Sequence, residues 1–421
     1  MIKVSIIIPI YNMAEWIEQC IVSIEQQSLK EIEIICINDG STDGSLDELN
    51  DLAGRYDNIV ILTQRNQGSG PARNLGIKHA RGEYLGFCDA DDYYASKEAI
   101  GHMYNAAKQY GAMLVHGNSC SLRDGVLSTR VSESVQRMEQ NTFVPSEEFS
   151  VRWSCWGVIY NREFIINNHI EFPPYKRGQD TVFFVESLAK AGKIYYMNEV
   201  VYVYQKGYKE IVFDEEKAIG VIRMYIDVLN LSSDYRMNRM HQTFVNRLKP
   251  DIGAMVYYYA FRGNKTVLDL ISQIIQAINP MLLDEDIHND FDLMGMQRLE
   301  EYKRYVYREQ ESFLNMLNTT ENVFIYGAGK AGKKVNRYLN NKGIHIKSFL
   351  VSDKSENPEK VDGVEVQEPA TIDTGISDYL IVVATYRSNE SIIKFLESKS
   401  LKNIYDLNYM HFMLWQDKII I

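Results

Sequence analysis

The first 120 residues alternate between short apolar runs and amphipathic segments, and this alternation narrows the range of folds that the chain can adopt. Strand-length and helix-length patterns that follow one another in this way are typical of βα units, which build a mostly parallel sheet. We therefore expect an α/β fold. The predicted strands cover residues 4–9, 32–38, 59–63, 83–88 and 113–118, and the predicted helices cover residues 14–26, 45–56, 70–79 and 97–110.

Polar residues follow four of these strands at the point where each strand should end. Ligands of parallel sheets bind at the carboxyl ends of the strands, so these residues are candidates for a binding site. We expect them to line one crevice. They are residues 9–12, 39–43, 65–74 and 89–92.

Three carboxylates, Asp89, Asp91 and Asp92, form a D-x-D type cluster at the end of the fourth predicted strand. Close carboxylates raise each other's pKa, so such a cluster usually holds a hard cation with oxygen ligands. A divalent metal bound there could grip a diphosphate. The alternative is that the cluster only caps a helix beginning near Ala95 and Ser96.

Length and charge limit the class of protein. A chain of 421 residues with 45% hydrophobic and 24% charged content predicts two or three globular domains. The net charge of -11 argues against a nucleic-acid partner, which requires a basic face. The five cysteines are odd in number and lack C-x-x-C spacing, so we interpret them as reduced core thiols.

No apolar stretch is long enough for a signal peptide or a membrane span. We expect a cytoplasmic protein, with peripheral attachment to the inner face of the membrane as the one membrane option. The aromatic residues Tyr257, Tyr258 and Tyr259 look exposed in the sequence and could serve such attachment or a homo-oligomer.

The pattern changes twice along the chain, which predicts three parts. Residues 1–212 carry the α/β pattern, and residues 213–319 turn helical, with helices expected at 218–229, 250–259 and 299–317. Residues 320–421 return to βα alternation. We expect the helical part to link the other two.

Five motifs occur in a fixed order within the first 210 residues. They are Val4-Ser-Ile-Ile-Ile-Pro-Ile-Tyr-Asn12, Ile37-Asn-Asp-Gly-Ser-Thr-Asp-Gly44, Gly70-Pro-Ala-Arg-Asn-Leu-Gly76, Gly82-Glu-Tyr-Leu-Gly-Phe-Cys-Asp-Ala-Asp-Asp92 and Gly178-Gln-Asp180. In these motifs the chain resembles the family 2 inverting nucleotide-sugar glycosyltransferases, which have the GT-A fold.

The resemblance implies a role for each motif. Pro9, Tyr11, Asn12 and Asp39 would hold the base and ribose of the donor nucleotide, and Arg73 would lie along the nucleotide. Asp91 would bind Mn²⁺ or Mg²⁺, and Asp89 would contact the ribose or the metal. The alternative for Asp39 is turn chemistry in the Asn-Asp-Gly-Ser-Thr-Asp-Gly segment.

The resemblance makes Asp180 the catalytic base that takes a proton from the acceptor hydroxyl. The alternative is a helix N-cap, where Asp is common. The family usually has Glu-Asp where this chain has Gln179-Asp180, so the tuning of the base stays open. The Gln-x-x-Arg-Trp motif of processive synthases is missing, which favours the addition of a single sugar.

Two tryptophans, Trp153 and Trp156, lie where the family's acceptor-binding residues usually fall. Aromatic faces stack on the CH surfaces of sugars, so we predict an acceptor contact. The alternative is that one or both belong to the core.

The C-terminal part contains a second glycine motif. Gly327, Gly329 and Gly332 follow a predicted strand at residues 323–326 and open a predicted helix, and Asp353 follows the next predicted strand, as in a dinucleotide fingerprint. The functional interpretation is a Rossmann-like domain that binds NAD or another nucleotide. The alternative is a docking domain whose glycines only permit a tight turn.

Together these features predict a metal-dependent inverting glycosyltransferase. It would move one sugar from a nucleotide-sugar donor, expected to be a UDP-sugar, to a hydroxyl of a glycan, which could be lipid-linked, in surface polysaccharide or glycoconjugate synthesis. One alternative function is a nucleotidyltransferase, but this chain lacks the Gly-rich N-terminal loop with basic residues that such enzymes usually have. The other alternative is a non-catalytic nucleotide-sugar-binding or scaffold protein of a glycan assembly complex.

Overall fold

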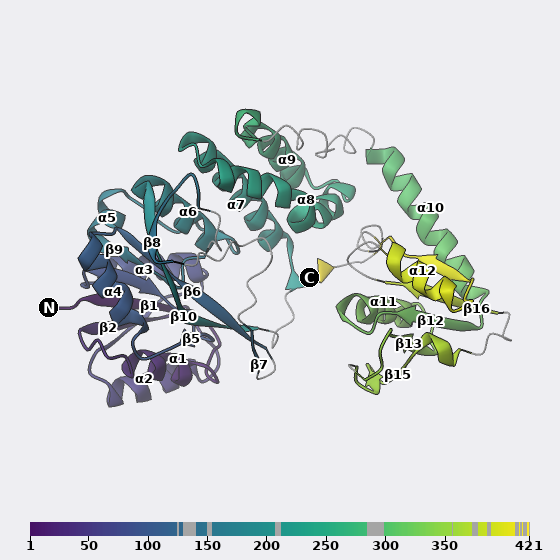
Figure 1. The fold of residues 1–421 in the computed structure, drawn as a ribbon, viewed down its shortest axis with the longest axis horizontal. Helices are drawn as coiled ribbons and strands as arrows, with labels where there is room; N and C mark the ends of the chain where they lie inside the picture. The colour runs from purple at the N-terminus through teal and green to yellow at the C-terminus, as the bar shows by residue number, and fades with distance from the viewer. Residues whose placement is uncertain are drawn as a thin grey trace. The chain divides into compact units, whose positions relative to one another are not determined.

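The computed structural model describes residues 1–123, 126–128, 140–149, 154–206, 212–283, 299–355, 357–372, 378–384, 389–408, 412, 415 and 419–420. Contacts group the chain into two compact units (Figure 1). The first comprises Met1–Val256, Asn264–Phe291 and Ile420–Ile421, and the second comprises Tyr257–Gly263 and Asp292–Ile419. The three-part division at residues 212 and 319 stays a prediction.

A mixed sheet forms the centre of the first unit. Its strand order is β3-β2-β1-β4-β9-β6-β10-β5, with β7 beside β6 and β8 beside β10. The half around β1 is parallel, and β9, β5, β7 and β8 run antiparallel to their neighbours. The strands are β1 Val4–Ile10, β2 Ile32–Asn38, β3 Ile59–Thr63, β4 Tyr84–Phe87, β5 Tyr93–Tyr94, β6 Leu114–Arg123, β7 Val126–Ser128, β8 Thr142–Pro145, β9 Val158–Asn161 and β10 Lys193–Lys206.

Helices cover both faces of this sheet, which confirms the predicted α/β class. Alternate side chains of β1 point to opposite faces. Ile6 and Ile8 pack in one core with α1 (Ile17–Glu25), α2 (Ser45–Arg55) and α4 (Ala99–Tyr110). Ile7 faces α3 (Ser69–His79), where a Cβ atom on Gly76 would lie 2.5 Å from its Cγ2. Helix α3 can therefore approach the sheet only because Gly76 has no side chain.

Helix α6 (Gln179–Ala191) lies on the same face as α3. Phe183 of α6 stacks on Phe172 with ring centroids 4.0 Å apart, and it meets Phe87 of β4 edge to face at 5.3 Å. Aromatic pairs of this kind add to the burial energy of their rings. This packing fixes the first turn of α6 relative to the ends of the central strands.

The remaining helices extend the first unit beyond the sheet. Helix α7 packs against α6 and α9. Helix α8 begins well before the predicted start at residue 250 and contains Pro250. The bounds are α5 Arg162–Asn167, α7 Glu215–Asp234, α8 Asn238–Phe261, α9 Lys265–Ala277 and the 3₁₀ turn η1 Pro280–Leu282.

The exposure predicted for Tyr258 and Tyr259 is wrong, and the side chain of Tyr257 lies outside the described residues. Tyr258 and Tyr259 are 5% and 9% exposed, because they pack on each other edge to face and within α8. Among the described helices, none combines the length and apolar content that a membrane crossing requires.

A second, mostly parallel sheet forms the second unit. Its order is β14-β15-β13-β12-β16-β17, and of the strand pairs that the structure describes in this sheet, β14 with β15 is antiparallel and the others are parallel. The chain reverses its winding at β12, as in doubly wound sheets. The elements are α10 Leu299–Asn318, β12 Asn322–Tyr326, α11 Lys330–Asn341, β13 Ser348–Leu350, β14 Lys360–Val361, β15 Val364–Gln367, η4 Pro369–Thr371, β16 Tyr379–Val383, α12 Glu390–Ser398 and β17 Ile404–Asp406; the short strands β11 (Val212–Phe213) and β18 (Ile419–Ile420) complete the chain.

Candidate active site

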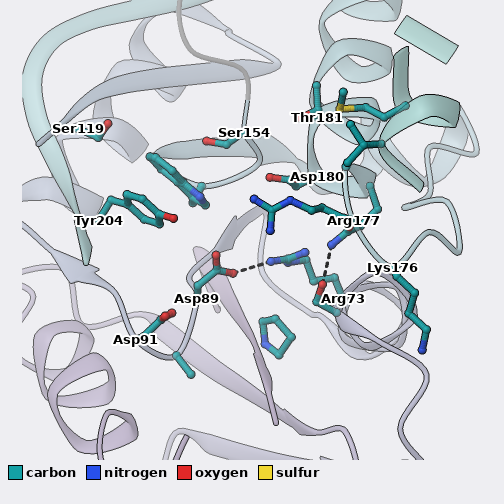
Figure 2. Close-up of a pocket in the computed structure, with 18 of the residues that line it drawn as sticks. Arg73, Asp89, Asp91, Ser119, Ser154, Lys176, Arg177, Asp180, Thr181 and Tyr204 are labelled. Carbon is teal, nitrogen blue, oxygen red and sulfur yellow. Dashed lines mark hydrogen bonds and ion pairs between the residues drawn. The ribbon is translucent and has the colours of Figure 1, made fainter. Parts of the chain in front are cut away.

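A cavity of about 810 Å³ opens in the first unit at the carboxyl ends of β1, β2 and β4 (Figure 2). The first turn of α6, strand β6 and helices α7 and α8 supply its other walls. Most of the residues predicted for the N-terminal site line this single cavity. They are Pro9, Tyr11, Asp39, Arg73, Asp89, Asp91, Trp156 and Asp180.

Asp39 organises the end of the cavity that lies beyond β2. Its side chain is 2% exposed, and it accepts hydrogen bonds from Gln64 Nε2 at 2.7 Å and from the backbone amides of Gln67 and Gly68 at 2.9 and 2.8 Å. Three donors compensate the burial of a carboxylate. Asp39 therefore fixes the loop that leads into α3, beside the exposed ring of Tyr11.

Asn12 lies in the loop after β1 and contacts the loop after β2. Its backbone is left-handed, with φ 54°, and its Oδ1 accepts a hydrogen bond from the Thr42 amide at 2.8 Å, while its own amide donates to Ser41 Oγ. Asn tolerates this conformation better than most residues. Asn12 thus connects the loops after β1 and β2, and a direct contact with a nucleotide stays a prediction.

Arg73 projects from α3 to Asp89, the residue that follows Cys88 at the end of β4. The guanidinium is 4% exposed, and its Nη2 donates to Asp89 Oδ1 at 2.5 Å. Nε and Nη1 of Arg73 are buried and have no hydrogen-bond partner among the described residues. A buried guanidinium with two unused donors is well suited to an anionic or hydroxyl-bearing ligand.

Asp92 has a structural role beside the two other aspartates. It is 1% exposed and accepts hydrogen bonds from Tyr202 Oη at 2.8 Å and from the Gln205 amide at 2.8 Å. Burial, together with the charges of Asp89 and Asp91, raises the pKa of Asp92 to about 9. The helix-cap alternative is wrong for this cluster, since β5 comes next and α4 begins only after Glu98.

Asp89 and Asp91 are the carboxylates of this cluster that line the cavity. No group of three or more His, Cys, Asp or Glu side chains within the described ranges is arranged to hold a metal. Mg²⁺ is commonly bound through one or two carboxylates plus substrate phosphates. The pair Asp89 and Asp91, crowded by a third acid, fits that mode of binding.

Asp180 occupies the second position of α6 and does not cap it. The N-cap is Gly178, with φ 90°, and no side chain among the described residues caps this helix end. Burial raises the pKa of Asp180; the Arg73 charge lowers it, and the Asp89 charge raises it again. A partly buried carboxylate with a raised pKa, facing a cavity, is a candidate general base.

Comparison with known proteins agrees with this geometry. The signature of "Glycosyl transferase family 2" matches residues 5–165. An uncharacterized glycosyltransferase of Haemophilus influenzae is 31% identical over 188 residues, which are 44% of this chain and 71% of that protein. The chain belongs to glycosyl transferase family 2.

Other relatives are longer than the shared region. The uncharacterized glycosyltransferase EpsJ of Bacillus subtilis is 34% identical over 212 residues, 48% of this chain and 61% of EpsJ. The poly(ribitol-phosphate) beta-glucosyltransferase of Bacillus spizizenii is 34% identical over 208 residues, 48% of this chain and 32% of that enzyme. The chain therefore spans less than two thirds of the length of these relatives.

A solved structure of this architecture confirms the GT-A type of fold. The crystal structure of S. aureus TarS 1–349 in complex with UDP-GlcNAc has a TM-score of 0.57 and 21% identity, and it covers 67% of this chain and 83% of that chain. Asp180 and the walls formed by α7 and α8 lie outside the segment that the family signature matches.

Trp156 lines the cavity, but its ring packs against tyrosines. It is 7% exposed and stacks on Tyr202 and Tyr204 with ring centroids 4.7 and 5.4 Å away. Tyr204 also lines the cavity and points its hydroxyl toward Asp89 in Figure 2. The acceptor contact predicted for Trp156 stays a prediction, and Trp153 lies outside the described residues.

Several lining residues were not predicted from the sequence. Lys176 and Arg177 lie in the loop before α6, and Figure 2 shows the Arg177 side chain between Asp180 and Asp89. Helix α7 supplies Tyr225 to the cavity wall, and helix α8 supplies Arg247 and Asp251. Asp251 Oδ2 accepts hydrogen bonds from Tyr225 Oη at 2.7 Å and from Arg247 Nε at 2.9 Å. The only sequence signal was the Lys-Arg pair next to the Gly-Gln-Asp motif.

The glycine motif of the second unit forms a tight strand-to-helix turn. Gly327 has φ 107°, and a Cβ atom on Gly332 would overlap the carbonyl oxygen of Gly327. Gly329 is the N-cap of α11. Asp353 is fully exposed and accepts hydrogen bonds from the amide and hydroxyl of Ser355 at 2.8 and 2.6 Å. The turn explains the glycines, and nucleotide binding there stays a prediction.

Proposed function

We propose that this protein is a metal-dependent, inverting glycosyltransferase that adds a single sugar from a UDP-sugar to a hydroxyl group of a glycan, in surface polysaccharide or glycoconjugate synthesis. One observation carries the proposal: a single cavity contains the Asp39 loop, the pair Arg73 and Asp89, and the carboxylate of Asp180. A relative that is a poly(ribitol-phosphate) beta-glucosyltransferase and a structural neighbour in complex with UDP-GlcNAc support the choice of substrate class.

Asp180 would act as the base. As the acceptor oxygen attacks the anomeric carbon, its proton passes to Asp180, the new glycosidic bond forms, and the bond from that carbon to the diphosphate breaks. Inversion follows because attack and departure occur on opposite faces of the carbon. The raised pKa of Asp180, caused mainly by burial, makes this carboxylate a stronger base than an exposed aspartate.

Arg73, Asp89 and Asp91 would bind the diphosphate end of the donor. Asp91 and Asp89 would hold Mn²⁺ or Mg²⁺, and a divalent cation there would stabilise negative charge on the departing nucleoside diphosphate. The guanidinium of Arg73 would add a fixed positive charge in a buried setting, where electrostatic stabilisation is strong.

The test measures the release of nucleotide from UDP-, GDP-, dTDP- and CMP-sugars by the full-length protein, with Mn²⁺, with Mg²⁺ and with a chelator. Turnover of one donor that requires the cation supports the proposal. Binding of a nucleotide sugar without turnover, in the presence of glycan acceptor mixtures, would instead support a non-catalytic binding or scaffold protein. Absence of both binding and turnover would refute both functions.

A further inference from the structure

Gln179 departs from the Glu-Asp pair that the sequence resemblance led us to expect, and the structure gives its amide a specific partner. Its Nε2 donates a hydrogen bond to Ser69 Oγ at 2.6 Å. Gln179 begins α6 and Ser69 begins α3, and both residues line the cavity. The amide therefore joins the two helix ends that carry Asp180 and Arg73.

The other end of the same amide lacks a partner. Gln179 is 6% exposed, and its Oε1 is buried with no hydrogen-bond partner among the described residues. A buried carbonyl oxygen left without a donor costs about 1–3 kcal/mol. Such an atom beside a ligand cavity points to a donor group supplied by the ligand.

The side chain of Gln179 packs closely against the start of α3. A Cβ atom on Gly70 would lie 2.9 Å from the Pro173 carbonyl oxygen and 3.1 Å from Gln179 Cγ, so α3 and this loop are in close contact. The hydrogen bond to Ser69 fixes the far end of the side chain. Both ends of Gln179 are thus held, and the direction of Oε1 is set by the fold.

The same wall also offers unused donors. Arg73 follows Ser69 by one helical turn of α3, is 4% exposed, and has Nε and Nη1 without hydrogen-bond partners in the described part of the chain. One wall of the cavity therefore presents a carbonyl acceptor and guanidinium donors. The matching ligand group both donates and accepts, as a sugar hydroxyl or an acetamido group does.

We propose that Gln179 is a specificity-determining residue for the transferred sugar: Ser69 orients its amide so that Oε1 accepts a hydrogen bond from a hydroxyl or acetamido N–H of the donor sugar. The inference rests on the proposed function. A neutral amide can accept this hydrogen bond without adding a further negative charge beside Asp180 and Asp89.

The test compares the binding of UDP with that of UDP-glucose and UDP-N-acetylglucosamine by calorimetry in the presence of Mn²⁺. Gln179→Met keeps the length of the side chain and removes both polar atoms. We expect the affinity for UDP to stay within about twofold of wild type, while the affinity for the preferred UDP-sugar falls roughly 3- to 10-fold, the loss of one hydrogen bond. Ser69→Ala, which frees the amide, should cause a smaller loss in the same direction.

Gln64→Met is the matched control, because Gln64 donates to Asp39 at the other end of the cavity. This control should weaken UDP and the UDP-sugar equally. If Gln179→Met and Ser69→Ala bind the UDP-sugar as wild type does, or weaken UDP to the same extent, Gln179 does not contact the sugar and the inference is wrong. Failure of the proposed function is distinguishable, because wild type itself would then bind neither ligand.

Discussion

Nη2 of Arg73 lies 2.5 Å from Oδ1 of Asp89, and this contact joins helix α3 to the loop after β4 inside the cavity. The two side chains differ in exposure, at 4% for Arg73 and 31% for Asp89. The pair therefore has one end buried in the protein and the other on the cavity surface. Loss of either partner should affect both folding and ligand binding.

Substitution Arg73→Ala should lower the free energy of unfolding and abolish donor binding. Removal of one partner from a buried ion pair costs about 3–5 kcal/mol. Because water reaches Asp89, we expect about 3 kcal/mol, measured by urea unfolding. Arg73→Lys keeps the charge but loses the fork of donors, so it should be more stable than Arg73→Ala and still bind the UDP-sugar poorly. Equal UDP-sugar affinity in wild type and Arg73→Lys would contradict this role.

The sequence predicted the central strands well because their patterns are local. The bounds of β2 and β3 match the predicted residues 32–38 and 59–63, and the helices α2 and α3 differ from prediction by one residue at one end. Strands of two to four residues, such as β5 and β9, carry too little periodicity to be seen. The helix through Pro250 was predicted to begin at the proline, because proline is favoured in the first turn of a helix and disfavoured in its interior. The helix instead begins at Asn238 and continues through the proline.

The residues of the site could be predicted from the sequence only where they belong to a recognisable motif. Asp89, Asp91 and Asp180 stand in motifs, and the structure places them on one cavity. Tyr225, Arg247 and Asp251 reach the cavity from helices with no motif. Long-range packing of α7 against α6 brings Tyr225 there, and the hydrogen bond from Tyr225 to Asp251 connects α8 to α7. The partners of Gln179 and Trp156 also depend on contacts between distant segments, which composition and periodicity do not reveal.

Substitution Asp180→Asn should stop sugar transfer while leaving the donor bound. The loss of a general base lowers turnover by about 10²- to 10⁴-fold, and Asn preserves the shape of the side chain. Turnover and UDP-sugar affinity should be measured on the same preparation. Asp91→Asn is the contrasting variant, for which we expect loss of cation-dependent donor binding itself. If Asp180→Asn keeps more than about a tenth of the turnover, a loss well below the general-base range, Asp180 is not the base.

His241 should make the stability of the first unit depend on pH. It is fully buried, accepts a hydrogen bond from the Asn279 amide at its Nε2 (2.9 Å), and pairs through Nδ1 with Ser232 Oγ at 2.8 Å. Burial lowers the pKa of His241 below its ordinary value of 6.5. The unfolded chain then binds a proton that the folded chain does not, so stability falls as the pH drops below that value.

The measurement is the thermal midpoint of wild type and His241→Gln between pH 7.5 and 5.5. One proton contributes at most about 1.4 kcal/mol per pH unit. We expect the difference between the two proteins to be largest at pH 7.5 and to shrink on acidification. A difference that is constant across this range would show that His241 keeps the same charge folded and unfolded.

Two glycines at the ends of α6 provide a paired test of how the position of Asp180 is set. Gly178 and Gly192 both have left-handed backbones, with φ 90° and 71°. A Cβ atom on Gly178 would lie 2.7 Å from Cβ of Met224, whereas one on Gly192 would meet no atom of the described part of the chain within 4 Å. Gly192→Ala should therefore lower the free energy of unfolding only by the cost of holding Ala in the left-handed conformation, about 1–2 kcal/mol, and it should leave turnover unchanged.

Gly178→Ala should lower the free energy of unfolding by more, about 2–4 kcal/mol, because α6 and α7 must also move apart. Since Gly178 immediately precedes Gln179 and Asp180, this shift displaces the base, and displacements near 1 Å can lower rates by about 10²-fold. Urea unfolding and turnover of the same UDP-sugar give the two quantities. If the two alanine variants lose equal stability and keep equal turnover, the close packing of Gly178 on Met224 does not position Asp180.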